Sequence, residues 1–196
     1  MHIQCECRSS RADSRVLITS FDVETAFTQS VYHDDLEVVS YSFRNTTAMT
    51  NTVRPLQDSD RAAWEPLWAG YQLFYEVEIP AETTDLTWAR FHDASEPMHA
   101  LGAFDENNNL VGIVHVIFHR STWLPKCSCY LQDLYVSNDQ RGLGTGAALI
   151  EAVADLARAN EAGRLYWMTH ETNATARRLY DKLAVASGFI QYRKNL

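Results

Sequence analysis

The sequence lacks any apolar run close to the ~20 residues that a membrane-spanning helix requires. Its first residues, Met1 to Arg15, also lack the apolar core of a secretory signal peptide. We therefore expect a cytoplasmic location and no membrane partner. The chain has 196 residues, of which 46% are hydrophobic and 21% are charged, and this composition excludes a disordered protein and fits a globular domain.

Cysteine is scarce, and its spacing does not favour a metal site. The four cysteines form two C-x-C pairs, Cys5/Cys7 and Cys127/Cys129. Structural zinc sites more often have C-x₂₋₄-C spacing, so we predict strand thiols and no metal. Basic residues are fewer than acidic residues, and the formal net charge is -8. An acidic protein repels nucleic-acid phosphates and attracts cationic ligands, so we expect no nucleic-acid partner.

The first part of the chain carries no motif. Val16 to Phe21 and Leu36 to Phe43 are candidate strands, but the pattern becomes regular only near Thr52. Met49 precedes a fresh strand-like segment. The hypothesis is that residues 1–48 are an N-terminal extension of uncertain structure, that residues 49–196 form the functional domain, and that Met49 is its natural start.

From Thr52 onward, strand-like and helix-like patterns alternate. Pro66 lies inside the first helical pattern and predicts a kink or an earlier break. The predicted helices run from Asp58 or Ser59 through Tyr71, from Pro80 through Arg90, from Thr145 past Leu156 to a stop at Gly163, and from Asn173 to Gly188. The predicted strands are Thr50–Pro55, His99–Phe104, Leu110–Phe118, Cys127–Val136, Leu165–Thr169 and Phe189–Tyr192. The order β-α-α-β-β-β-α-β-α-β predicts an α/β domain around a mixed sheet.

The most informative segment is the glycine loop, which we define as Gln140 to Ala147. It lies between a strand and a helix, where backbone amides have no intrahelical partner and carry partial positive charge. Glycines let the backbone approach phosphate oxygens closely, and Arg141 adds a permanent cation. The pattern therefore predicts a pyrophosphate-binding loop.

The loop has three other possible interpretations. A nucleoside triphosphate loop needs G-x-x-x-x-G-K-[ST], which is absent. A dinucleotide motif is formally matched by Gly142, Gly144 and Ala147, but that motif normally opens its domain, and the expected acidic residue would fall near Glu161 in a loop. A purely structural glycine turn is the third. The pyrophosphate of coenzyme A fits the position of the loop better.

The loop also carries the signature of a known family. Arg141-Gly142-Leu143-Gly144-Thr145-Gly146 matches [QR]-x-x-G-x-[GA], and the sequence resembles the Gcn5-related N-acetyltransferases (GNAT) from about Thr52 to Asn195. Asn173, Leu179-Tyr180 and Ser187-Gly188-Phe189 follow in the family's order. The resemblance implies a mixed, mostly antiparallel central sheet flanked by about four helices, acetyl-CoA as cosubstrate and no metal.

The resemblance assigns roles to individual residues. Backbone groups of Leu134, Tyr135 and Val136 would pair with the pantetheine arm like an added strand. Tyr180 matches the tyrosine that protonates the departing thiolate. Asn173 resembles the asparagine that hydrogen-bonds the cofactor arm, and the pyrophosphate would be held by the backbone of Arg141, Gly142, Leu143, Gly144, Thr145 and Gly146.

The sequence indicates the general base of the reaction less directly. The segment Tyr130 to Val136 resembles the same strand in spermidine/spermine N-acetyltransferases, where a Glu-Asp pair serves as base and amine-binding group. Here the glutamate position is Gln132, which cannot accept a proton. Asp133 is therefore expected to hold or deprotonate the amine, directly or through water. His115 and His119 lie on one face of the preceding strand and are alternative bases or ordinary strand residues. His170 is placed beside the cofactor groove.

The acceptor is expected to be cationic. An aromatic cluster with Glu76 and Glu78 beside it suits an amine, although core packing must account for at least half of its members. Its members are Trp64, Trp68, Tyr71, Phe74 and Tyr75. The last part of the chain also resembles the yeast histone and polyamine acetyltransferases.

The sequence thus predicts an N-acetyltransferase that moves acetyl from acetyl-CoA to a primary amine by direct attack. The acceptor is a polyamine, another small amine or a basic peptide, and dimers are common in the resembling family. Because Gln132 replaces the family's glutamate, a non-catalytic acyl-CoA-binding sensor of the same fold is the alternative.

Overall fold

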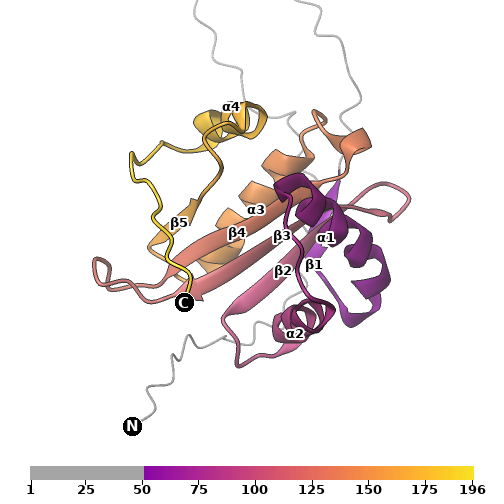
Figure 1. Cartoon of the computed structure of the whole chain (residues 1–196), viewed down its shortest axis with the longest axis horizontal. Coiled ribbons are helices and arrows are strands. Elements are labelled where there is room, and N and C mark those ends of the chain that lie inside the picture. Colours follow the sequence, from indigo (N-terminus) through magenta and orange to yellow (C-terminus); the bar gives the residue numbers. More distant parts are fainter. Residues whose placement is uncertain (1–50) are drawn as a thin grey trace, which may run out of the picture. The chain divides into compact units, whose positions relative to one another are not determined.

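The computed structural model describes residues 51–196 (Figure 1). The predicted N-terminal extension, residues 1–48, lies outside the described residues, together with its two candidate strands and the Cys5/Cys7 pair.

The described residues form one five-stranded sheet in the order β1-β2-β3-β4-β5. Neighbouring strands are antiparallel from β1 to β4, and only β4 and β5 run parallel. The strands are β1 (Thr52–Pro55), β2 (Met98–Phe104), β3 (Leu110–His119), β4 (Ser128–Val136) and β5 (Arg164–Trp167). The helices are α1 (Arg61–Tyr75), α2 (Ala81–His92), α3 (Thr145–Ala159) and α4 (Ala174–Leu183). The predicted fold class, a mixed and mostly antiparallel sheet flanked by helices, is confirmed.

Several boundaries differ from the prediction. Asp58–Asp60 forms a short 3₁₀ turn, and α1 begins after it and continues through Pro66 without a break. Helix α3 ends at Ala159, before Gly163, because Glu161 adopts a left-handed backbone with φ of 51°. Both differences concern where a helix begins or ends, which local turn geometry decides rather than apolar spacing.

The predicted last strand is not paired in the structure. Residues after Leu183 form no helix or strand among the described residues, and Phe189 and Ile190 are 79% and 75% exposed. Alternating apolar residues favour a strand, but a strand also needs a neighbouring strand with which it can form hydrogen bonds. The order of elements from β1 to α4 is the predicted one.

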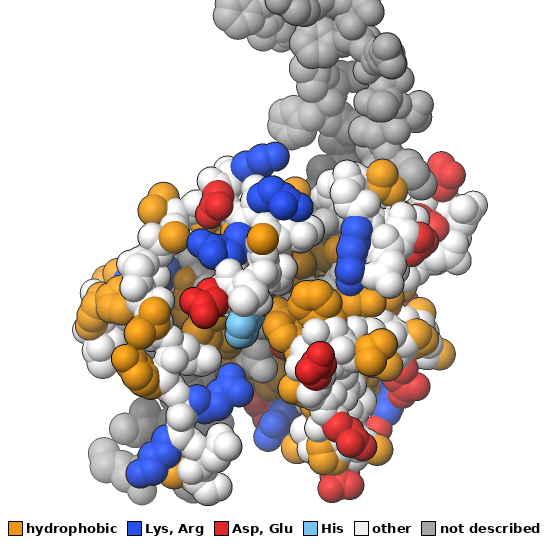
Figure 2. Space-filling model, turned by 45° about the horizontal axis from the view of Figure 1, so that its top comes forward, with side chains coloured by type: hydrophobic (Ala, Val, Ile, Leu, Met, Phe, Trp, Pro, Cys, Tyr) orange, Lys and Arg blue, Asp and Glu red, His pale blue; other side chains and the backbone are white. Residues whose placement is uncertain are grey.

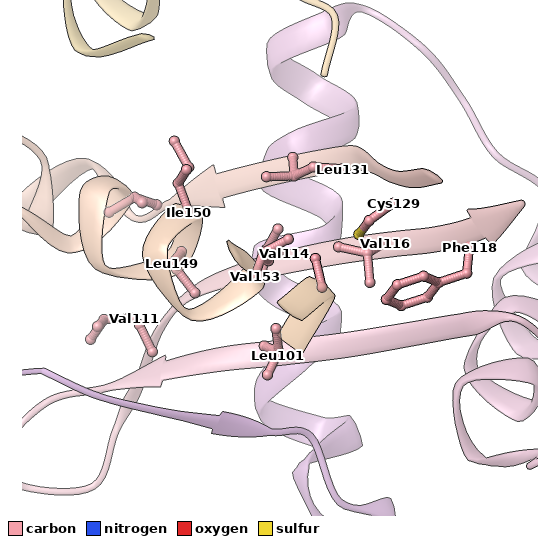
Figure 3. Packing of buried hydrophobic residues seen from close by; sticks show 13 residues of the cluster. Leu101, Val111, Val114, Val116, Phe118, Cys129, Leu131, Leu149, Ile150 and Val153 are labelled. Atoms are coloured by element: carbon pink, nitrogen blue, oxygen red, sulfur yellow. The ribbon is translucent and has the colours of Figure 1, made fainter. Parts of the chain in front are cut away.

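The sheet has two covered faces, as Figure 1 shows. On one face, α3 inserts Leu149, Ile150 and Val153 among side chains from β2, β3 and β4 (Figure 3). Gly112 permits this approach, because a Cβ there would lie 3.1 Å from a methyl group of Leu149. On the other face, α1 and α2 bury Trp64, Leu67, Trp68 and Trp88 against Ile113 and its neighbours.

A β-bulge at Gln132 divides β4 into two halves. His115 pairs with Asp133 but Val116 pairs with Leu131, so Gln132 has no partner on β3. Before the bulge, Leu131 faces α3; after it, Leu134 and Val136 face α3. The extra residue therefore turns Asp133 and Tyr135 to the α1 face of the sheet.

Candidate active site

The glycine loop follows β4 and leads directly into α3. Gly142 and Gly144 have φ of 78° and 94°, a region that side chains strongly disfavour. A Cβ at either position would meet nothing within 4 Å. The glycines are therefore required by backbone conformation, and the loop faces open space.

The backbone amides of this loop are free to receive an anion. From Gly142 to Ala147 no amide donates a backbone hydrogen bond within the described residues, and the first such bond is from Ala148 to the Gly144 carbonyl, at 3.0 Å. The α3 dipole adds partial positive charge at this end of the helix. The loop thus has the donor set of an oxyanion-binding site.

Arg141 is fixed beside the loop by its own backbone surroundings. Its Nε donates to the Val136 carbonyl at 3.0 Å. Its guanidinium lies 5.3 Å from the centre of the Tyr135 ring and 5.9 Å from that of Phe74. The cation therefore connects the glycine loop, the end of β4 and the end of α1.

The second half of β4 has an open edge. Strand β5 pairs with β4 only from Ser128 to Leu131, and it ends at Trp167. Beyond the bulge, β4 is paired with β3 alone. The segment from Leu134 to Val136 therefore has backbone groups that no strand pairs on the side that would face β5, although the Val136 carbonyl already accepts from Arg141 Nε.

Asp133 is the last member of a buried polar chain. The Trp64 indole Nε1–H donates to His115 Nε2 at 2.9 Å, and His115 Nδ1 lies 3.0 Å from Asp133 Oδ2. An indole nitrogen can only donate, so His115 must accept at Nε2 and donate from Nδ1. The imidazole is thus neutral in this arrangement, and it holds Asp133 as the acceptor carboxylate.

This arrangement distinguishes two of the predicted bases, Asp133 and His115. Both ring nitrogens of His115 are occupied and its exposed fraction is 2%, so it cannot reach a substrate. Burial and the nearby Asp133 carboxylate raise the pKa of the Tyr71 phenol. The interpretation of His115 as a direct base is therefore wrong, and its imidazole orients Asp133 instead.

His119 and His170, the other two histidines that the sequence singles out, also form hydrogen bonds. His119 donates from Nδ1 to the Arg120 carbonyl at 2.8 Å, and its Nε2 accepts from the Tyr166 hydroxyl at 3.0 Å. This leaves His119 without a free basic nitrogen. His170 Nδ1 hydrogen-bonds the Thr172 hydroxyl at 2.7 Å just before α4.

Tyr180 lies on α4, and Asn173 is the N-cap residue of that helix. Tyr180 packs edge-on against Trp167, with ring centroids 5.4 Å apart. Burial, with the Tyr75 hydroxyl nearby, raises the pKa of Tyr180 to about 12, so the phenol remains protonated at neutral pH. Asn173 caps α4 by accepting from the Ala176 amide at 3.3 Å and donates to Thr169 Oγ1 at 3.1 Å.

The aromatic cluster divides into a buried part and an exposed part. Trp64 and Trp68 are core residues, whereas Phe74 and Tyr75 are 50% and 37% exposed. Tyr71 lies between the two parts. Figure 2 shows a face of the molecule on which hydrophobic side chains gather at the centre of the view, with basic side chains above them. The structure thus brings the end of α1 beside Arg141 and leaves apolar rings accessible there.

The described residues contain neither a membrane helix nor a metal cluster. Within residues 51–196, no helix combines the length and the apolarity needed to cross a bilayer. No group of three or more His, Cys, Asp and Glu side chains in that range is arranged to hold a metal ion.

Comparison with known proteins decides the family. Residues 64–184 match the model of the Acetyltransferase (GNAT) family. This chain is a GNAT family member. The match includes the bulged β4, the glycine loop and α4, which are the elements that form the candidate site.

Individual GNAT relatives agree with this assignment. The chain is 35% identical over 146 residues to the D-amino-acid N-acetyltransferase HPA3 of Saccharomyces cerevisiae, a match that covers 73% of this chain and 89% of the relative. It is 30% identical over 149 residues to the uncharacterized N-acetyltransferase YhfO of Bacillus subtilis, covering 74% and 97%. The crystal structure of a ribosomal-protein-alanine N-acetyltransferase from Brucella melitensis biovar Abortus 2308 superposes with a TM-score of 0.62 at 25% identity, covering 75% of this chain and 100% of that one. The chain is an acetyl-transferring enzyme.

Sequence reasoning missed two contacts of this candidate site. The Trp64–His115 hydrogen bond joins α1 to the sheet, and no sequence signal pairs these residues. Asn51 Nδ2 donates to Thr145 Oγ1 at 2.7 Å and was not singled out. The sequence does not predict the bulge either, because the pattern around Gln132 is that of an ordinary strand.

Proposed function

We propose that this enzyme transfers the acetyl group of acetyl-CoA to a primary amine by direct attack, without a covalent enzyme intermediate. The observation that carries the proposal is the bulge at Gln132, which turns the buried Asp133 carboxylate to the α1 face of the same strand whose open edge leads into the glycine loop. A cofactor site and an amine-binding group thus share one strand.

The loop fits a pyrophosphate. Its unpaired amides from Gly142 to Ala147, its two glycines with positive φ and the adjacent Arg141 match the oxygens and the charge of that group. The open edge of β4 at Leu134, Tyr135 and Val136 offers backbone groups for the pantetheine arm, apart from the Val136 carbonyl, which already accepts from Arg141. Asn173 Nδ2 uses one hydrogen for Thr169 and retains a second that can reach the arm. When bound, acetyl-CoA supplies the acetyl group as an activated thioester.

The residues at the reacting end have complementary roles. Asp133 attracts the ammonium form of the acceptor and takes the proton that must leave before the nitrogen can attack. Tyr180 stays protonated and donates to the departing sulfur. Gln132 is exposed on the bulge and takes no part in proton transfer, so its lack of a carboxyl group does not remove the base.

The acceptor class is a small amine. The exposed rings of Phe74 and Tyr75, with Glu76 and Glu78 beside them, favour a cationic group. The name of the yeast relative adds D-amino acids to the polyamines and basic peptides that the sequence nominates.

The experiment is acetyl transfer from acetyl-CoA to a panel of D-amino acids, L-amino acids, polyamines, aminoglycosides and basic peptides, with products identified by mass. We expect turnover with at least one class, abolished in Asp133→Asn. Asp139→Asn serves as the control, because Asp139 is an exposed loop carboxylate. Absence of turnover across the panel, with coenzyme A binding intact, would contradict the proposal.

A further inference from the structure

The bulge at Gln132 also places Tyr130 beside Asp133. Tyr130 pairs with Ile117 of β3, and Asp133 pairs with His115. Because Ile117 and His115 are two positions apart on their strand, Tyr130 and Asp133 are successive side chains on one face of β4, with Cα atoms roughly 7 Å apart. Without the extra residue, positions 130 and 133 would point to opposite faces of the sheet. The bulge therefore puts a phenol ring next to the carboxylate on the α1 face.

A second tyrosine extends this ring surface onto β5. Tyr130 and Tyr166 are register partners on the two parallel strands. Their rings stack, with centroids 5.0 Å apart and planes at 22°. The Tyr166 hydroxyl donates to His119 Nε2 at 3.0 Å, which holds this ring in place. We call Tyr130 and Tyr166 the tyrosine pair; both residues are only half-buried, so part of their ring surface is accessible.

The tyrosine pair lies outside the hydrophobic core. Neither residue belongs to the two hydrophobic clusters of residues 51–196, which form under α3 and under α1 and α2. The neighbouring side chains Cys129, Leu131 and Leu165 point to the other face and pack in the α3 cluster. Accessible aromatic surface beside a buried polar group is typical of the lining of a small-molecule site.

The charges on this face favour an acceptor with a single ammonium group. Among the described residues that share the α1 face of β3, β4 and β5, Asp133 is the only acidic one. The other permanently charged side chain of that set is Arg164, two residues before Tyr166 on β5. Burial and, second, the Asp133 carboxylate raise the pKa of the Tyr130 phenol, so this ring stays uncharged. A second ammonium would therefore meet neutral rings and a guanidinium, not a carboxylate.

On the basis of the function proposed above, we infer that the tyrosine pair is the subsite for the acceptor's substituent and selects primary amines that carry an aromatic or large apolar group and no second positive charge. The amino group lies at Asp133, and the substituent lies against Tyr130, one side-chain step along β4. The tyrosine pair binds the acceptor and moves no proton. Tyr130 is therefore a specificity-determining residue, and Asp133 remains the base.

Paired acceptors test this subsite through kcat/KM at saturating acetyl-CoA. The pairs are phenethylamine with ethylamine and, in the series that the yeast relative's name suggests, D-phenylalanine with D-alanine; putrescine represents a doubly charged amine. We expect the wild-type enzyme to prefer the aromatic member of a pair, and to prefer phenethylamine to putrescine. Tyr130→Ala should lower kcat/KM roughly tenfold for the aromatic member, the usual effect of losing an aromatic contact, and change that of the short member little.

Two further variants act as controls. Tyr130→Phe keeps the ring and should retain the wild-type preference for the aromatic member. Phe189→Ala removes a ring that is 79% exposed and should change no kcat/KM. Coenzyme A affinity should be the same in all three variants, because none of the altered side chains belongs to the glycine loop or to the open edge of β4.

The outcomes separate this inference from the proposed function. An equal loss for both members of a pair in Tyr130→Ala would overturn the inference, because the ring would then act on the carboxylate or the fold and not on the substituent. A wild-type preference for putrescine or for the short amines would also overturn it. Each of these results leaves acetyl transfer to an amine standing. A wild-type enzyme that acetylates no amine would instead refute the proposed function, and the inference with it.

Should Tyr130→Ala fail to fold, the wild-type protein still provides the test. Tyrosine labelled with ¹³C in the ring reports on each phenol by NMR. Saturating phenethylamine, added to the coenzyme A complex, should shift the Tyr130 and Tyr166 signals through its ring current and leave the signal of Tyr192, which is 89% exposed, in place. Unmoved signals from the tyrosine pair at saturation would overturn the inference.

Discussion

The Asn51 side-chain amide donates a 2.7 Å hydrogen bond to the Thr145 hydroxyl, joining residues 94 positions apart. Thr145 is 2% exposed, and its hydroxyl lies 3.3 Å from the Gln140 carbonyl, to which it donates. The first residue of α3 is therefore tied both to the beginning of the glycine loop and to the segment that precedes β1. This contact holds in place a loop whose own amides have no internal partners.

We expect Asn51→Ala to loosen the loop. Losing a partner of a buried hydroxyl costs about 1–3 kcal/mol, so thermal stability should fall measurably. The KM for acetyl-CoA should rise several-fold while kcat changes less, because the loop contributes to binding rather than to proton transfer. Asn107→Ala, in the exposed hairpin loop, should alter neither quantity. An unchanged KM would mean that the loop is held by other contacts.

The glycines of the loop should be intolerant of substitution. Gly144→Ala places a Cβ at φ of 94°, which costs roughly 1–2 kcal/mol in the left-handed region. We expect calorimetric affinity for coenzyme A to fall at least tenfold, because relief of this strain moves the amides. Gly188→Ala imposes a similar strain at φ of 79° outside the loop. If both variants lose affinity equally, general destabilisation rather than loop geometry is responsible.

Tyr180→Phe should slow the reaction without weakening cofactor binding. The raised pKa of about 12 keeps the phenol protonated, and its removal deprives the leaving sulfur of a donor. We expect kcat to fall by roughly two orders of magnitude with coenzyme A affinity within about threefold. The exposed Tyr192→Phe serves as the comparison. A variant with wild-type kcat would assign the proton donation elsewhere.

The buried Cys129 predicts alkaline instability. Burial raises the pKa of its thiol from 9.0 to about 12, because the thiolate is disfavoured inside the core. A raised folded-state pKa contributes stability that is fully present below pH 9 and is lost as the pH rises toward 12. Urea unfolding at pH 8 and pH 11 should therefore show a smaller loss for Cys129→Ala than for wild type. An equal loss would show that other groups account for the alkaline instability.

The functional domain is predicted to begin at Met49. A chain that starts there retains β1, Asn51 and all the site residues. We expect it to melt cooperatively by circular dichroism and to match the full chain in acetyl transfer. Loss of folding or of activity would show that residues 1–48 belong to the working enzyme.

Much of the fold followed from residue patterns. The apolar spacing of α3 and the turn-forming Asp105 to Asn109 segment are local signals, and the structure has the helix and the hairpin where they predict them. The last strand was predicted from the same kind of pattern and is not paired, since pairing depends on a neighbouring edge that the local sequence does not specify.

The histidines illustrate what the sequence could not predict about the candidate site. Sequence spacing puts His115 and His119 on one face of β3, and both satisfy the chemical requirements of a base. Only the packing of α1 against the sheet brings the Trp64 N–H to His115, and only the pairing of β5 with β4 places the Tyr166 hydroxyl near His119. These contacts leave neither histidine with a free ring nitrogen.

By itself the sequence determined the glycine loop, since positive φ angles and free amides at a helix start depend on residues that are adjacent in the chain. The tertiary structure alone decided which face of the sheet the Asp133 carboxylate lies on. One unpaired residue, Gln132, reverses the direction of every later side chain in β4, and that reversal exists only in the hydrogen-bond register with β3.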